Sequence, residues 1–206
     1  KKEFGLSHTN VHYVKYSSNN KFYRLIFDIP KIIKSYKIDY AHYQYISPFF
    51  KTTKEIVTIH DILFNDFPQY FPLSYRLKNN FLFKKSAKRA DLLLTVSEYS
   101  KQKIAEHYHI DANKIFITPN GVDNAFFNVK EHKHLPNIKA KYDLNNYVLC
   151  ISRIEPRKNH VNLIKAFVEL KLYEKGYNLV LIGKEDLVNK EMHLCLENLC
   201  PETKTT

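Results

Sequence analysis

The chain has 206 residues, of which 44% are apolar and 26% are charged, a composition typical of a globular protein and not of a disordered one. Its formal net charge is +11, and its four glycines are too scattered for a P-loop, a kinase glycine loop or a G-x-G-x-x-G dinucleotide fingerprint. Three unevenly spaced cysteines do not suit a disulfide framework, which favours a reducing compartment, and no apolar run approaches the roughly 18 residues of a membrane span.

The predicted elements begin with a helix over residues 22–36, in which Pro30 predicts a kink or a break. Short β-rich runs follow, at 40–46, 55–59, 92–96, 114–118, 147–151 and 178–182. Further helices are expected at 74–89, 98–108 and 160–173, the last two with Ser97 and Asn159 as N-caps. This alternation predicts parallel sheets covered on both faces. The eight residues between the first two runs are short for a parallel crossover.

A change of character along the chain predicts two domains. Residues 124–146 are polar, contain a proline and have no clear period, as expected of a connection between domains. The sequence therefore predicts a partial α/β domain at residues 1–128, a linker at 129–145, and the opening β-α-β of a second domain at 146–206.

The positive charge is concentrated in the first half. Residues 1–109 carry 18 Lys and Arg against nine Asp and Glu, whereas residues 110–206 carry 14 against 12. This imbalance indicates an anionic partner for the first half, or else a lysine-rich composition without function. The densest stretch runs from Arg76 to Arg89, with Phe81 and Phe83 between the cations. It suits either an interfacial helix on anionic lipid or a core helix with a basic polar face.

Polar residues follow several predicted strands. In open parallel sheets ligands bind at the carboxyl ends of the strands. Four strand-end residues are therefore expected to line one cleft between the two domains: His60, Ser97, Asn120 and Arg153.

The strongest local pattern is the segment CISRIEPRKNH, residues 150–160. A strand ends, a proline turn carries cations, and a helix begins directly afterwards. Backbone N–H groups at a helix N-terminus bind anions, and Arg153 and Lys158 would add charge-assisted contacts to a diphosphate. The alternative is a solvated turn.

Several motifs together carry a resemblance to a known family. The string SRIEPRKNHVNLIKAF, followed by NLVLIGK, resembles the start of the donor-binding domain of family 4 glycosyltransferases, which are retaining enzymes of the GT-B fold. Upstream, VTIHDILFNDFPQYF, AKRADLLLTVSEYSKQKIAEHYHI and KIFITPNGVD are similar to the second half of that family's acceptor domain, in the same order. The resemblance covers roughly residues 30–184. It implies a partial N-terminal Rossmann-like acceptor domain and the first β-α-β of a C-terminal Rossmann-like donor domain.

The resemblance also implies residue roles. Arg153 and Lys158 match the pair that holds the donor diphosphate and stabilises the leaving group, with Asn159 in the same turn. His60 matches the active-site histidine near the transferred sugar. The residues expected to line the cleft are Asp61, Ser97, Asn120 and Gly121.

No metal is expected. The family generally needs none, and the sequence has no Asp-x-Asp motif. Two His-x-His pairs, at His107 and His109 and at His132 and His134, are not joined by a carboxylate or cysteine at a useful spacing. The chain is therefore expected to use a nucleotide-sugar as a substrate and to hold no cofactor.

The resemblance implies transfer of a hexosyl group from a GDP- or UDP-linked sugar to a glycan or lipid-linked acceptor, with retention. The motifs favour a mannosyl group as the hexosyl group. The motifs EPRKNH and HDILF are similar to those of hexosyltransferases of envelope polysaccharide, including lipopolysaccharide, assembly. The protein would be cytoplasmic, with a peripheral contact to the inner membrane face through the stretch from Arg76 to Arg89.

Two alternatives remain open. The family's glycine-rich loop would precede Lys1 and its Glu-x7-Glu motif would follow Thr206, so the chain could be a catalytically inactive fragment, truncated at both ends. The other alternative is a basic nucleic-acid-binding protein. The sequence lacks an RRM, zinc-finger or helix-turn-helix signature and has only five arginines that could read bases, so no nucleic acid is expected as a partner.

Overall fold

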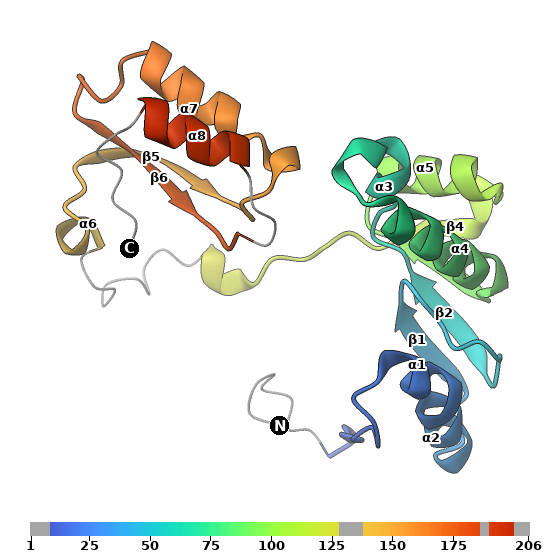
Figure 1. The fold of residues 1–206 in the computed structure, drawn as a ribbon. Coiled ribbons are helices and arrows are strands. Elements are labelled where there is room, and N and C mark those ends of the chain that lie inside the picture. Colours follow the sequence, from blue (N-terminus) through green and yellow to red (C-terminus); the bar gives the residue numbers. More distant parts are fainter. Residues whose placement is uncertain (1–8, 128–137, 186–189, 200–206) are drawn as a thin grey trace. The chain divides into compact units, whose positions relative to one another are not determined.

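The computed structural model describes residues 9–127, 138–185 and 190–199. It forms two compact units, divided between Gly121 and Val122 (Figure 1). The predicted linker, residues 129–145, is described only from residue 138, where the short helix α6 (Ile138–Lys141) begins. The 3₁₀ turn η4 (Asn124–Phe126) lies just after the division.

Unit 1 is built on a four-stranded parallel sheet, with the strands side by side in chain order. These strands are β1 (Tyr40–Gln44), β2 (Lys54–Thr58), β3 (Leu92–Thr95) and β4 (Ile115–Ile117). The helices that connect them are α3 (Leu63–Asp66), α4 (Leu73–Arg89) and α5 (Glu98–Tyr108), with 3₁₀ turns η2 (Pro68–Tyr70) and η3 (Ala112–Lys114). The predicted parallel α/β class is confirmed.

The first helical region changes its hydrogen bonding before Pro30, in place of a sharp break. It consists of α1 (Lys21–Tyr23), a π-helical turn η1 (Arg24–Asp28) and α2 (Ile29–Ser35). The Ile29 N–H bonds to the Arg24 carbonyl, five residues back. Because Pro30 has no N–H to donate, a widened turn immediately before it keeps the segment helical.

The core of unit 1 lies between the sheet and its helices. Val57 and Ile59 of the β2 region are fully buried, as are Ile104 and Tyr108, which are one turn apart on α5. The predicted N-cap of α5 is confirmed, since Ser97 Oγ accepts the Ser100 N–H at 3.2 Å. Burial raises the pKa of Tyr108.

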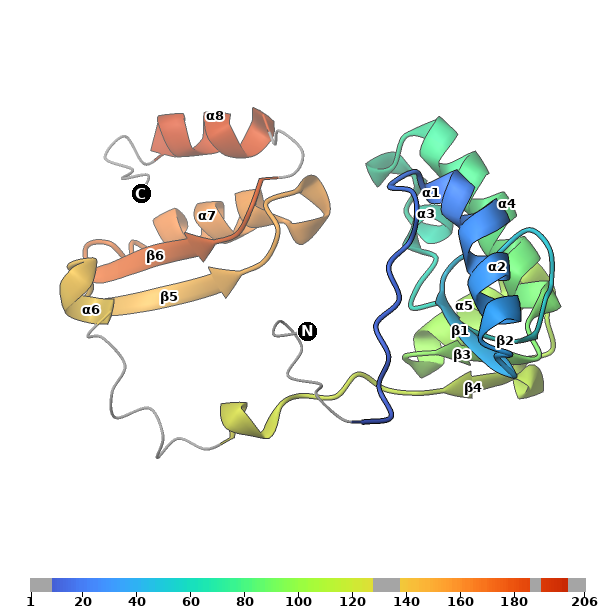
Figure 2. The ribbon, with the colours of Figure 1, turned by 90° about the horizontal axis from the view of Figure 1, so that it is seen from below.

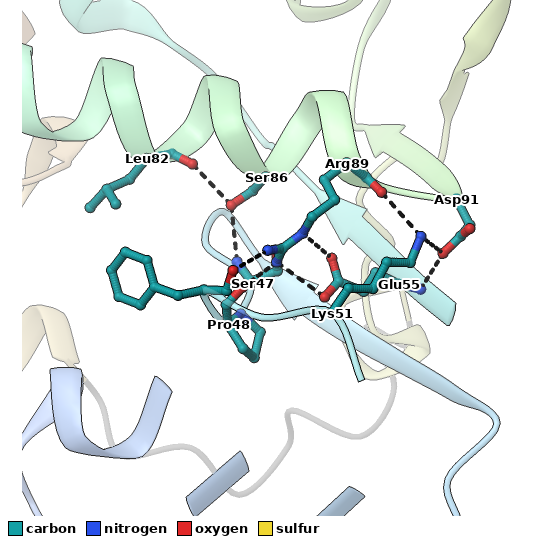
Figure 3. Close-up of polar contacts among 9 residues, drawn as sticks. Ser47, Pro48, Lys51, Glu55, Leu82, Ser86, Arg89 and Asp91 are labelled. Atoms are coloured by element: carbon teal, nitrogen blue, oxygen red, sulfur yellow. Dashed lines mark hydrogen bonds and ion pairs between the residues drawn. The ribbon is translucent and has the colours of Figure 1, made fainter. Parts of the chain in front are cut away.

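The short joint between β1 and β2 is a parallel connection without a helix, and a buried ion pair secures it (Figure 3). The Arg89 guanidinium, at the end of α4, bonds both oxygens of Glu55, at 3.0 and 3.1 Å. The same guanidinium donates to Ser47 Oγ and to the carbonyls of Pro48 and Phe49, which lie in the connection. Side-chain hydrogen bonds thus hold this short parallel connection, which contains no crossover helix.

Unit 2 has a two-stranded parallel sheet, β5 (Asn146–Ile151) and β6 (Tyr177–Ile182). Between them run the 3₁₀ turn η6 (Pro156–Lys158) and α7 (His160–Glu169), which ends four residues before the predicted 173, and α8 (Lys190–Leu199) follows β6. Both helices lie on one side of the sheet (Figure 2).

The predicted covering of both faces is wrong for the described part of unit 2. Strand residues alternate between faces, so Leu179 and Leu181 pack against α7 and α8, whereas the opposite face stays open. Its apolar side chains are 39–70% exposed and belong to Tyr147, Leu149, Ile151 and Ile182.

Candidate functional site

Five of the expected site residues lie at one edge of the unit 1 sheet. Because β1 to β4 are parallel neighbours, their carboxyl ends share that edge. His60 and Asp61 follow β2 and Ser97 follows β3; all three are half-buried. Asn120 and Gly121 follow β4 and are exposed.

His60 is held by residues that the sequence reading did not select. Its Nε2 lies 2.6 Å from Oε1 of Gln44, the last residue of β1. Its ring centroid lies 5.3 Å from that of Tyr45. The predicted strand extends to residue 46, two residues beyond the end of β1, so Gln44 lies inside the predicted strand and not at its end. A strand ending at residue 44 would have placed Gln44 among the polar strand-end residues.

Asp61 and Ser97 each have a structural task at this edge. Asp61 Oδ1 accepts the Leu63 N–H at 3.3 Å, at the start of α3, and Ser97 caps α5. Asp61 also acts electrostatically on Tyr45: burial first, then the Asp61 charge, raises the pKa of Tyr45 to about 12.

The segment between β5 and α7 forms a compact turn. Lys158 N–H bonds to the Glu155 carbonyl and Asn159 N–H to the Pro156 carbonyl, both at 3.0 Å. The side chains of Arg153, Lys158 and Asn159 are exposed. The structure thus carries the three residues expected to bind the diphosphate on one eight-residue segment, 152–159.

Asn159 occupies the N-cap position of α7, but its side chain makes no capping hydrogen bond, contrary to the prediction. The reason is its backbone: φ is 59°, in the left-handed region, whereas a capping side chain requires an extended backbone. The side chain of Asn159 therefore satisfies none of the first N–H groups of α7.

Two close contacts support this turn. Ser152 Oγ and His160 Nε2 lie 3.1 Å apart, and His160 is only 1% exposed, so the end of β5 is joined to the start of α7. Directly after β6, a Cβ at Gly183 would lie 1.8 Å from the Ser152 carbonyl oxygen, so only glycine fits there. His160 and Gly183 both belong to the motifs quoted above, but their spacing in the sequence does not predict these contacts.

Of the two cations inside η6, one is already paired. Arg157 forms an ion pair with Glu155, with 2.6 Å between Nη2 and Oε1. The next residue, Lys158, is exposed. Lys158 as a diphosphate ligand stays a prediction.

The helix from Arg76 to Arg89, within α4, has the buried face expected of a core helix, whereas its contact with lipid stays a prediction. Leu82, Phe83, Ser86 and Ala87 are buried against the sheet. On the outer side, Leu73, Leu77 and Phe81 recur every four residues and are 62–64% exposed.

Metal-binding and membrane-spanning features can be assessed only within the described residues. There, no three His, Cys, Asp or Glu side chains gather as a metal site would require. His107 bonds to Asp66 at 2.9 Å, and the pair His132 and His134 lies outside the described residues. No helix in the described part of the chain has the length and apolar character needed to cross a membrane.

The fold defines the class first. A glycosyltransferase from Rickettsia africae, 22% identical, matches 94% of this chain and 52% of its own length with a TM-score of 0.60. A Staphylococcus aureus protein, MnaA, solved with UDP and 14% identical, matches 93% of this chain and 52% of its own with a TM-score of 0.51. The architecture is that of a partial GT-B fold.

The family follows from the sequence comparisons. The model described as Glycosyltransferase Family 4 matches residues 3–126, and the model described as Glycosyl transferases group 1 matches residues 132–204. The chain therefore belongs to glycosyltransferase family 4, as the motifs implied.

Curated relatives are bacterial glycosyltransferases. The O-antigen chain mannosyltransferase RfbU of Salmonella typhimurium is 33% identical over 135 residues, covering 64% of this chain and 33% of the relative. The O-antigen chain mannosyltransferase B of Escherichia coli is 29% identical over 175 residues, or 75% and 45% of the two chains. A Campylobacter jejuni 4-alpha-N-acetylgalactosaminyltransferase, which acts on a diphospho-undecaprenol-linked sugar by its name, is 30% identical over 128 residues, or 62% and 32%. The matched part of this chain thus spans about a third to less than half the length of these relatives.

Proposed function

We propose that this protein transfers a hexosyl group, with mannose as the first candidate, from a nucleotide-diphosphate sugar to a glycan or lipid-linked acceptor, with retention of configuration. The observation that carries the proposal is the turn between β5 and α7. It presents Arg153 and Lys158 beside a helix start that its own Asn159 side chain does not cap. That arrangement suits a diphosphate.

The chemistry of the leaving group explains these residue types. When the glycosidic bond to the nucleotide breaks, negative charge grows on the diphosphate. Fixed cations and backbone N–H groups complement that charge most strongly in the transition state. Two side-chain cations, with no metal ion, would meet the charge, so transfer by this protein should persist in the presence of a chelator.

Unit 1 would supply the acceptor side. His60 is proposed to lie near the transferred sugar, and Asp61, Ser97, Asn120 and Gly121 would line the cleft. The common edge on which the structure places these five residues supports this assignment. That this edge and Arg153 line a single cleft between the two units stays a prediction.

The choice of donor and acceptor draws on the relatives. Two of them are named O-antigen chain mannosyltransferases and one is an N-acetylgalactosaminyltransferase whose acceptor is a diphospho-undecaprenol-linked sugar. A GDP- or UDP-linked hexose and a lipid-linked glycan are therefore the first compounds to test. These relatives favour a transferase over the nucleic-acid-binding alternative.

A lipid-linked acceptor would bring the protein to the cytoplasmic membrane face. The outer side of α4 suits this task, because Leu73, Leu77 and Phe81 are exposed and the cations Arg76 and Lys78 lie among them. One of these, Lys78, lies over the Phe22 ring at 5.0 Å, which adds an α1 aromatic side chain to the same surface. We propose a peripheral contact with anionic lipid here. A Leu77→Glu, Phe81→Glu double variant should cosediment less with anionic vesicles than the unaltered chain does. Unchanged cosedimentation would refute the contact.

The direct test is transfer of radiolabelled mannose from GDP-mannose, and of N-acetylgalactosamine from its UDP form, to a polyprenyl-diphosphate-linked glycan. We expect product from the unaltered chain. Arg153→Ala or Lys158→Ala should lower kcat/KM by roughly 10²–10³-fold, the loss typical of one donor that stabilises a developing anion. An inverted anomeric configuration in the product would refute retention.

Lys165→Ala is the matched control for these variants. Lys165 is an exposed lysine on the same helix, α7, beyond its first turn. If the Arg153 and Lys158 variants behave like Lys165→Ala, the assignment of these two residues as diphosphate ligands fails. If the unaltered chain makes no product, the assignment of this chain as a transferase fails and the inactive-fragment alternative stands.

A further inference from the structure

The carboxyl end of β1 places an amide against the proposed active-site histidine. Gln44 Oε1 lies 2.6 Å from His60 Nε2. A carbonyl oxygen can only accept a hydrogen bond, so Nε2 is the protonated nitrogen of the ring. In the neutral imidazole Nδ1 then carries the lone pair, and the contact selects one of the two tautomers.

The backbone around Gln44 fixes this contact. Gln44 pairs with Thr58, two residues before His60, in the register of β1 and β2. The next residue, Tyr45, donates its N–H to the Thr58 carbonyl at 2.9 Å, with φ at 65°. A non-glycine residue in this left-handed region is strained, and such residues persist where surrounding contacts hold them, often at functional sites.

The Tyr45 side chain supplies those contacts. Its ring stacks on Phe83, with centroids 4.9 Å apart and 28° between the planes. The centroid of the Tyr45 ring also lies 5.3 Å from that of the His60 ring. The phenol of Tyr45 is uncharged at neutral pH, as tyrosine ordinarily is, and burial, followed by the Asp61 charge, raises its pKa further, to about 12. Tyr45 thus packs against the imidazole ring while Gln44 holds its Nε2.

We propose that Gln44 is a positioning residue for His60, which holds the ring with Nε2 protonated so that Nδ1 is its acceptor. This inference rests on the proposed function, in which His60 lies near the transferred sugar. An acceptor nitrogen suits the O–H of a sugar hydroxyl, whereas the opposite tautomer would present an N–H. Gln44 would therefore contribute to the preference for a sugar with a hydroxyl at the contacted position.

The tautomer can be measured directly on the 206-residue chain by long-range ¹H–¹⁵N NMR of histidine rings, with a His60→Gln variant to assign the signal. We expect His60 in the Nε2-protonated form. Gln44→Leu, which removes the acceptor, should shift the ring to a mixture of tautomers. Gln44→Glu, whose carboxylate accepts in the same place, should keep the Nε2-protonated form.

Two results would overturn the proposal: an Nδ1-protonated His60 in the unaltered chain, or an unchanged tautomer in Gln44→Leu. Circular dichroism establishes that each variant is folded. If Gln44→Leu does not fold, Gln44→Met gives the same test with an unbranched side chain of similar length.

Transfer activity gives a second readout that separates the two proposals. Gln44→Leu should lower kcat roughly ten- to hundredfold, as loss of a group that orients a functional histidine does, with little change in the KM for the donor. Gln44→Glu should restore most of the loss. A changed tautomer with unchanged transfer would contradict the role of His60 in the proposed function and leave its positioning by Gln44 intact.

Discussion

The two units contain similar βαβ elements but differ in how deeply their sheets are buried. In unit 1, β2 has three of its five residues buried, and the core gathers side chains from the sheet, α2, α4 and α5. In unit 2, no residue of β5 or β6 is fully buried, and the buried cluster consists of two residues each from α7 and α8. Within the described residues, the sheet of unit 2 is thus less deeply buried than that of unit 1.

This difference shows where each proposed site obtains its precision. The His60 edge belongs to a packed sheet and is positioned by long-range contacts. The turn between β5 and α7 is held by the Ser152–His160 hydrogen bond, which is local in the chain, and by the close approach of Gly183 to Ser152, which joins segments far apart in the chain. Variants that disturb one unit should leave the other largely intact, and hydrogen exchange measured on peptides from each sheet can tell them apart.

The largest effect is expected in unit 1 from Arg89→Met. This change leaves Glu55, 1% exposed, as a buried carboxylate without its cation, and should cost about 3–5 kcal/mol of unfolding free energy. The measurement is urea denaturation, with exchange of the β2 and β3 peptides as the local readout. The double variant Glu55→Leu, Arg89→Met should recover much of the loss. A single variant as stable as the unaltered chain would refute the role given to this ion pair.

The glycines of unit 2 give the next effect. A Cβ at Gly183 meets backbone at 1.8 Å, so Gly183→Ala should destabilise unit 2 by roughly 1–3 kcal/mol or more and accelerate exchange in β5 and β6. Gly176→Ala has open space, but φ is +75°, so a loss of about 1 kcal/mol is expected.

Gly121→Ala, at the end of unit 1, has neither obstacle and serves as the control for a glycine-to-alanine change as such. It should be nearly neutral. If Gly183→Ala is as stable as Gly121→Ala, the close approach at Ser152 is not a constraint on the turn.

Alkaline pH should affect unit 1 through Tyr45. Its pKa is raised from 10.0 to about 12 in the folded state, so between these values the unfolded chain loses a proton that the folded chain keeps. The contribution to stability is fully present below pH 10 and is lost as pH rises toward 12. Tyr45→Phe should make the decline of unfolding free energy over this range shallower. An identical slope would contradict the environment described for this residue.

The smallest effect should appear in acid at Asp91, on the surface of unit 1. A hydrogen bond from Lys51, then one from the Glu55 backbone, lowers the pKa of Asp91 from 3.8. Its contribution to stability is present above this ordinary value and disappears as pH falls through the lower, folded-state pKa. Asp91→Asn should reduce the acid sensitivity slightly, and since the pair is exposed, added salt should reduce it too.

The sequence predicted the strands β1 to β6 and the helices α2, α4, α5 and α7 because their hydrophobic periods are clear, but it did not predict α3, α6 or α8. The helix at 98–108 and its cap Ser97 match the structure, and the strands differ by one or two residues at their ends. Such an error at one strand end concealed Gln44. The capping role assigned to Asn159 failed because residue type predicts a side-chain bond only when the backbone is extended, and here φ is positive.

Other features depend on contacts between residues far apart in the chain, which no local pattern carries. Arg89 reads as one more cation in a basic helix, yet it pairs with Glu55, 34 residues earlier, and holds the β1–β2 connection. Asp66 and His107 meet across 41 residues. The candidate residues themselves were found because strand-end positions and helix starts are visible in sequence.

The central claim, that the start of α7 binds the donor diphosphate, is tested most directly by calorimetric titration of the chain with GDP and with UDP. At least one nucleotide should bind, and Arg153→Ala and Lys158→Ala should each weaken binding about tenfold or more, as expected for loss of a charge-assisted hydrogen bond. Lys165→Ala should bind as the unaltered chain does. Absence of binding to either nucleotide, or equal affinity in all three variants, would contradict the account.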